Sequence, residues 1–185
     1  MRSTVVFGFL LLAAVTSGAG PVLDSMSFGK GENPAVSVTR HADVQVVETA
    51  ALSEEGVCRG RGKSYNLFNW RPKGWKPNAN YTLVVKARSF AGENAFNALV
   101  MKRRPSGKVV EGFYPASGVM LGSGMREYRF PFRTDSCEPD SINFYKARPT
   151  DPDKGIDISS VKLLEGSETN LEILPIYRGG RGARG

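Results

Sequence analysis

The feature that most constrains this fold is a series of short runs in which apolar and polar residues alternate, separated by Gly, Pro, Asn and Asp. Period-two alternation is typical of β-strands with one buried face. We find no window of ten or more residues with the i, i+3, i+4, i+7 pattern of an amphipathic helix. The predicted strands are 22–28, 36–39, 44–49, 64–70, 81–89, 96–103, 108–114, 127–133, 141–146 and 156–164. Many short strands with turn-rich connections predict an all-β fold, a two-sheet antiparallel β-sandwich or jelly roll.

The alternation also assigns the two faces of the predicted strands 81–88 and 127–133, because successive side chains of a strand point to opposite sides. The expected core residues are Tyr81, Leu83, Val85, Ala87, Tyr128, Phe130 and Phe132. The opposite faces carry Thr82, Val84, Lys86, Arg88, Arg129, Pro131 and Arg133. Such a basic face is either solvated surface or the lining of a groove. Pro105, Ser106 and Gly107 predict a hairpin turn between two strands.

The N-terminus predicts export. Met1 and Arg2 form a short positive region, 5–15 is apolar, and Ser17 and Ala19 are small residues at a cleavage site. This pattern indicates a secretory signal peptide over 1–19; an uncleaved anchor is the alternative. No later stretch is apolar enough to cross a bilayer. We therefore expect a secreted, extracellular or periplasmic protein.

The domain organisation follows from the same patterns. A β-sandwich domain is predicted over 20–166, and a connector with a disordered Arg/Gly tail over 167–185. The formal net charge of +7 includes Arg2 and three arginines of the tail. Without these four residues the body carries about +3, which is too weak for a nucleic-acid footprint. We therefore predict no nucleic-acid partner, RNA binding by the tail being the alternative.

The chain has two cysteines, Cys58 and Cys137, and one histidine, His41. In an oxidising compartment the two cysteines are predicted to form a disulfide; two free, buried thiols are the alternative. A zinc cluster or a Cys–His nucleophile is not expected, since neither cysteine has a CxxC partner.

Three segments resemble a known family. "WKPNANYTLVVKARS", "MREYRFPFRT" and "GIDISSVKLLEG" are similar, in this order, to segments of carbohydrate-binding modules of the family four and nine type. The resemblance implies a galactose-binding-like jelly roll that holds a polysaccharide or oligosaccharide without cleaving it, usually beside a glycoside hydrolase. We also expect a monomer.

The resemblance bears on calcium as well. Ser159 stands where many relatives have a calcium-binding Asp, although Asp157 shares its strand face, and the opening segment 25–29 lacks its acid. Calcium prefers several oxygen ligands, carboxylates among them. We therefore expect no required cofactor; a structural calcium ion at Asp157 remains the alternative.

Sugar binding needs flat aromatic faces for a pyranose ring and polar groups for its hydroxyls. The aromatic candidates are Tyr65, Trp70, Trp75, Phe113, Tyr114 and Tyr145, and the polar candidates are Lys86, Arg88, Asn97, Arg103 and Asn143. From these the predicted ligand-binding residues are Trp70, Lys86, Arg88, Asn97, Arg103 and Tyr145. Core packing is favoured for Trp75, whereas surface and core are equally open for Trp70. The arginines predict an acidic or sulfated glycan, because guanidinium forks match carboxylate and sulfate geometry.

Catalysis is not expected from this chain. It has no E-x-D-x-x-E run, G-x-S-x-G, H-E-x-x-H or P-loop. Glu138 and Asp140 flank a proline, where acids are normally turn formers. The prediction is non-catalytic carbohydrate binding; an adhesion or assembly domain and a glycoside hydrolase fragment are the alternatives.

Overall fold

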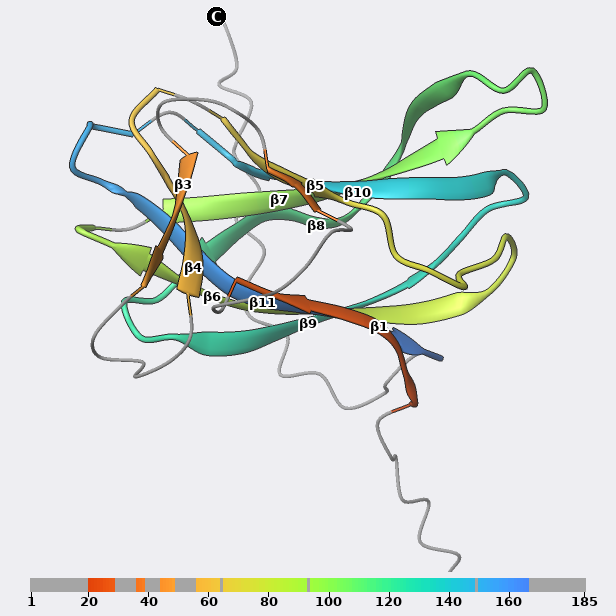
Figure 1. Ribbon diagram of the computed structural model, residues 1–185, viewed down its shortest axis with the longest axis horizontal. Coiled ribbons are helices and arrows are strands. Elements are labelled where there is room, and N and C mark those ends of the chain that lie inside the picture. The colour runs from red at the N-terminus through yellow and green to blue at the C-terminus, as the bar shows by residue number, and fades with distance from the viewer. Residues whose placement is uncertain are drawn as a thin grey trace, which may run out of the picture.

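The computed structural model describes residues 20–28, 36–38, 44–48, 56–63, 65–92, 94–148 and 150–166 (Figure 1). All regular secondary structure in these ranges is β-strand. In the same ranges no helix is long and apolar enough to cross a membrane. The predicted signal peptide at 1–19, His41 and the predicted tail at 167–185 lie outside the described residues.

The strands form two antiparallel sheets that stack face to face, as Figure 1 shows. The first sheet, sheet A, has the order β3-β4-β11-β6-β9, and β1 also pairs with β11. Its strands are β1 (Val22–Ser27), β3 (Val44–Glu48), β4 (Gly56–Arg61), β6 (Asn80–Phe90), β9 (Arg126–Arg133) and β11 (Gly155–Glu165). Sheet B has the order β2-β5-β10-β7-β8. Its strands are β2 (Val36–Val38), β5 (Asn66–Trp70), β7 (Asn94–Arg103), β8 (Val109–Leu121) and β10 (Glu138–Lys146). The predicted two-sheet β-sandwich is thereby confirmed.

The core lies between the sheets and is built from the inward residues of each strand. Phe68 of β5 stacks on Phe144 of β10 with ring centroids 4.5 Å apart. The predicted inward residues of β6 and Tyr128 of β9 are buried, and Phe130 and Phe132 pack against the same core. Alternation therefore predicted these faces correctly, because an apolar side chain stabilises the fold only on the strand face that is removed from water.

Two strand features were not predicted. β4 was missed because glycines at 56 and 60 interrupt its pattern. A Cβ at Gly60 would overlap the Leu67 side chain, so the close approach of β4 to β5 requires glycine there. β8 continues past its predicted end through Pro115 and Gly118, with three register shifts against β7 that break the alternation.

The predicted disulfide between Cys58 and Cys137 is wrong, because both cysteines are free thiols. Cys58 is buried in β4, where its thiol contacts the Leu67 carbonyl oxygen at 3.8 Å. Cys137 lies in the connection from β9 to β10, at the opposite end of the sandwich from β4 (Figure 1). Sequence spacing alone could not show this separation. Burial raises the pKa of the Cys58 thiol to about 12, so this thiol stays protonated and unreactive at neutral pH.

We expect the thermal unfolding midpoint of the purified protein to be the same with and without a thiol reductant, since no cross-link is removed. A disulfide closing the chain between Cys58 and Cys137 would instead add about 4 kcal/mol. A fall of more than ~5 °C on reduction would show that the two thiols pair after all. Titration with a thiol reagent in denaturant should count two thiols per chain, matching the two cysteines of the sequence.

Candidate functional site

The outer face of sheet B carries the polar and aromatic side chains best suited to bind a ligand. Tyr145 of β10 lies opposite Asn97 of β7, and Asn143 of β10 lies opposite Asn69 of β5. The residues between them along β10 and β5, such as Phe144, point into the core. We call the following six residues the tyrosine–amide face: Asn69, Asn97, Tyr114, Ser141, Asn143 and Tyr145.

Two tyrosines supply the aromatic surface of this face. The rings of Tyr114 in β8 and Tyr145 in β10 meet edge to face, with centroids 6.2 Å apart and an interplanar angle of 73°. Tyr114 is 47% exposed, whereas Tyr145 is half-buried. Burial, followed by a hydrogen bond with Tyr114, raises the pKa of Tyr145 well above its usual value. Tyr145 therefore remains a neutral phenol that can donate and accept hydrogen bonds across the physiological range.

Hydrogen bonds hold the amide groups in place. The Asn69 Nδ2 group donates to Ser141 Oγ at 3.0 Å and also to Asn143 Oδ1. The backbone N–H of Gly118 donates to Asn97 Oδ1 at 2.6 Å. These bonds fix the carboxamide planes on β5, β7 and β10 before any ligand arrives, which lowers the entropic cost of binding.

The chemistry of the tyrosine–amide face matches a polar, uncharged ligand. Its six members include no charged side chain. Tyrosine rings present apolar surface with a polar tip, and carboxamides both donate and accept hydrogen bonds. Such a combination can cover the C–H surface of a sugar ring and pair with its hydroxyl groups.

The structure brings together two of the six predicted ligand-binding residues, Asn97 and Tyr145, on this face. Trp70 lies fully buried in the core, so it offers no exposed ring and is not part of the candidate site. Lys86 and Arg88 belong to β6 of sheet A. Tyr114 and Asn143, from the wider candidate set, do lie on the face, whereas Trp75 packs against the core as predicted. Sequence reasoning missed Asn69 and Ser141.

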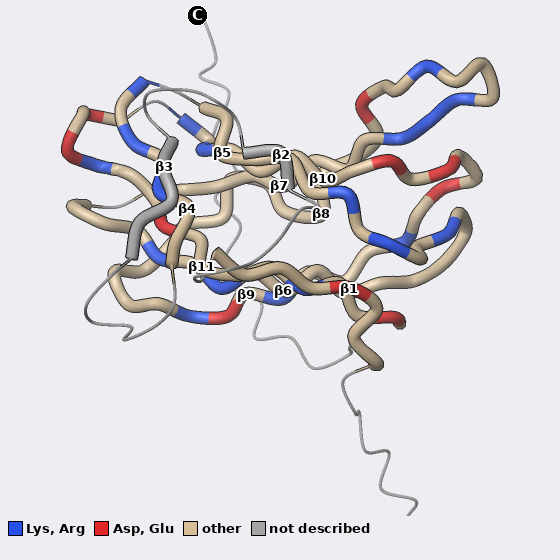
Figure 2. The backbone as a smooth tube through the Cα atoms, viewed as in Figure 1, with Lys and Arg blue, Asp and Glu red and all other residues tan. Residues whose placement is uncertain are grey.

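Arg103, the sixth predicted residue, ends β7 where the hairpin to β8 begins. Its guanidinium donates to the Gly107 carbonyl oxygen at 3.0 Å and pairs with Asp140. Gly107 has φ +81°, which a glycine adopts without strain and which forms the predicted turn. Figure 2 shows that this hairpin projects beyond the sandwich and that most of its charged residues are Lys or Arg. Arg103 therefore stabilises the hairpin.

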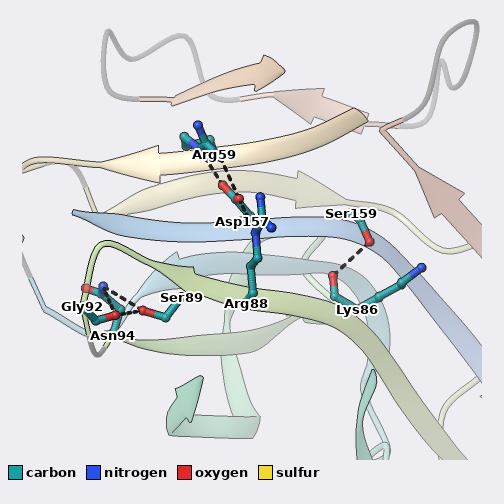
Figure 3. Close-up of polar contacts among 8 residues, drawn as sticks. All are labelled: Arg59, Lys86, Arg88, Ser89, Gly92, Asn94, Asp157 and Ser159. Atoms are coloured by element: carbon teal, nitrogen blue, oxygen red, sulfur yellow. Dashed lines mark hydrogen bonds and ion pairs between the residues drawn. The ribbon is translucent and has the colours of Figure 1, made fainter. Parts of the chain in front are cut away.

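Asp157, the predicted calcium ligand, is held instead by two arginines (Figure 3). Its carboxylate accepts bonds from Arg59 Nε at 2.6 Å and Arg59 Nη2 at 2.8 Å, and from Arg88 Nε at 2.8 Å. The Asp157 side chain is fully buried, and the Arg59 guanidinium lies 4.4 Å from the centroid of the Phe90 ring. Nor do the described residues contain a group of three or more His, Cys, Asp or Glu side chains that could hold a metal. These residues do not fit a calcium ion, since two cations already surround the carboxylate.

The fold is that of carbohydrate-binding modules. It resembles the CBM22-1 xylan-binding domain of Paenibacillus barcinonensis Xyn10C, with a TM-score of 0.59 and 15% identity over 80% of this chain and 97% of that domain. It equally resembles the C-terminal family 22 carbohydrate-binding module of Clostridium thermocellum Xyn10B, with a TM-score of 0.59 and 16% identity over 81% of this chain and 96% of that one. A xylan-binding domain of family 22 also matches, with a TM-score of 0.60 and 15% identity over 83% of this chain and 99% of that domain.

Comparisons of sequence alone found nothing: neither a protein-family model nor a curated protein matches the chain. The structural similarities, all at low identity, establish the fold and confirm the jelly roll implied by the sequence resemblance. The narrower resemblance to the family four and nine type is not confirmed, because the similar structures above belong to family 22.

Proposed function

We propose that this protein is a non-catalytic carbohydrate-binding module whose tyrosine–amide face holds a polysaccharide. The observation that carries the proposal is the packing of Tyr114 against Tyr145 beside the hydrogen-bonded amides of Asn69, Asn97 and Asn143. Support also comes from two of the similar structures, which are named as xylan-binding domains.

The proposed ligand of this face is a neutral polysaccharide. An acidic glycan would need cations to offset its charge, and none of the six residues supplies one. Conversely, uncharged phenol and carboxamide groups satisfy sugar hydroxyls without desolvating an ion. The face crosses four neighbouring strands, roughly 14 Å at ~4.8 Å per strand, which favours an oligosaccharide segment over a single sugar.

The biological setting is part of the same proposal. A secreted, monomeric module that holds a polysaccharide is expected to act beside a glycoside hydrolase. The predicted export signal supports an extracellular or periplasmic location, where such substrates occur.

We predict that Tyr145→Ala weakens binding to soluble xylan about tenfold or more, because it removes the half-buried ring and the edge contact with Tyr114. Tyr145→Phe keeps the ring and loses only the hydroxyl, so its affinity for xylan should fall about threefold. Affinity gel electrophoresis in the presence of xylan, with a second gel containing mixed-linkage glucan, measures both effects.

A matched pair of asparagine substitutions controls for a general loss of folding. Asn143→Ala removes a carboxamide from the tyrosine–amide face, whereas Asn80→Ala removes one from sheet A. The first should weaken binding and the second should not. Equal losses, or xylan and glucan binding unaffected by Tyr145→Ala, would contradict the proposal. A reducing-sugar assay on the same samples should show no cleavage; release of reducing ends would point to a hydrolase instead.

A further inference from the structure

A further outward amide, Asn66, lies next to the tyrosine–amide face and is not among its six residues. Asn66 begins β5, is exposed, and lies directly opposite Tyr145 of β10. Tyr145 in turn lies opposite Asn97 of β7. Residues directly opposite each other on neighbouring strands project from the same face of a sheet. Asn66, Tyr145 and Asn97 therefore form one row across three strands, on the outer face of sheet B.

A bulge in β5 places Asn66 on this face. β5 pairs with β10 at Asn66 and next at Phe68, so Leu67 is the extra residue of the bulge. Leu67 and Phe68 are both buried in the core. Asn66 and Asn69 can therefore both lie on the outer side, although they are three residues apart and simple alternation would put them on opposite faces. Bulges commonly redirect a side chain next to a functional site.

The two amides that flank Tyr145 differ in the hydrogen bonds that they already make. Asn97 Oδ1 accepts a hydrogen bond from the backbone N–H of Gly118 at 2.6 Å, which leaves the Nδ2 group of Asn97 to donate. Among the described residues, the carboxamide of Asn66 has no hydrogen-bond partner. Asn66 can therefore both donate and accept, so it can pair with two neighbouring hydroxyl groups of one sugar.

We propose that Asn66 is a further ligand-binding residue, which contacts the sugar unit next to the one on Tyr145. This inference rests on the proposed function, since it extends the same site. Neighbouring strands lie ~4.8 Å apart, so Asn66 and Asn97 stand on either side of Tyr145 and roughly 10 Å from each other. A polysaccharide that crosses β5, β10 and β7 thus meets an amide, an aromatic ring and a second amide in succession.

The test compares the full chain with Asn66→Ala, using isothermal titration calorimetry with xylohexaose and with cellohexaose. We expect the substitution to lower the affinity about fivefold for each oligosaccharide that the unmodified protein binds, because a hydrogen bond to the ligand is lost. The thermal unfolding midpoint should change by less than ~2 °C, since Asn66 is exposed and its side chain bonds to none of the described residues.

A second measurement uses the unmodified protein, so it does not depend on how the variant folds. In nuclear magnetic resonance spectra, the side-chain amide signals of Asn66 should shift when the bound oligosaccharide is added. Signals that stay in place would overturn the proposal, because they would show that no ligand reaches this carboxamide.

Asn80→Ala is the matched control, since it removes an exposed carboxamide from β6 in sheet A. A loss with Asn66→Ala no larger than with Asn80→Ala would overturn the proposal. If Tyr145→Ala weakens binding and Asn66→Ala does not, the further inference fails and the proposed function stands. If the unmodified protein binds neither oligosaccharide, the proposed function fails, and this inference fails with it.

Discussion

Replacing Trp70 with alanine is expected to lower the free energy of unfolding by about 4 kcal/mol. The Trp70 side chain is fully buried at the end of β5, opposite Ile142 of β10, in the core between the sheets. The substitution would leave a cavity that the neighbouring strands cannot close. Urea denaturation monitored by far-ultraviolet circular dichroism measures the change.

Trp70→Phe provides the control for this prediction. It keeps a buried ring, and the Trp70 Nε1 group has no hydrogen-bond partner among the described residues, so its loss breaks no such bond. We expect a loss of about 2 kcal/mol or less. If Trp70→Ala changed stability by under ~1 kcal/mol, the ring would have to lie at the surface, and its exclusion from the candidate site would be wrong.

Replacing Asp157 with alanine is expected to destabilise the fold by about 3 kcal/mol. The loss leaves the side chains of Arg59 and Arg88, which are only 23% and 22% exposed, close together without their shared carboxylate. The figure lies at the lower end for a broken buried ion pair, because both arginines remain partly hydrated. The same urea denaturation measures it.

Asp151→Ala is the matched control for the buried carboxylate. Asp151 pairs with Lys154 at 2.7 Å, but its side chain is 67% exposed, so its removal should change stability by under about 0.5 kcal/mol. Equal effects of Asp151→Ala and Asp157→Ala would contradict the structural role of the two arginines.

The sequence predicted the strands where burial alone decides the pattern. In β6, one face is apolar from Tyr81 to Ala87, and these residues lie in the core. β4 was missed because its strand is set by contact with β5, which excludes a side chain at Gly60, and not by the residues of β4 alone. β8 extends past its predicted end because bulges change its register against β7.

The candidate site could be predicted only in part. Alternation shows which residues of a strand share a face, but it does not show which strands are neighbours. Asn97 and Tyr145 were predicted as polar and aromatic candidates, yet their meeting depends on the pairing of β7 with β10. The pairing of Arg88 with Asp157 joins residues 69 positions apart, and no local pattern indicates it. For this reason Arg88 was predicted to bind a ligand, whereas in the structure it pairs with Asp157.

The central claim is that a neutral polysaccharide binds the tyrosine–amide face. The most direct measurement is a titration of the isotope-labelled protein with xylohexaose, followed by amide chemical-shift changes in nuclear magnetic resonance spectra. The predicted result is that the shifts concentrate on Asn69, Asn97, Asn143 and Tyr145, with Lys86 and Lys162 unchanged. Shifts confined to sheet A, or no shifts with xylohexaose and with a matching glucan oligosaccharide, would contradict the claim.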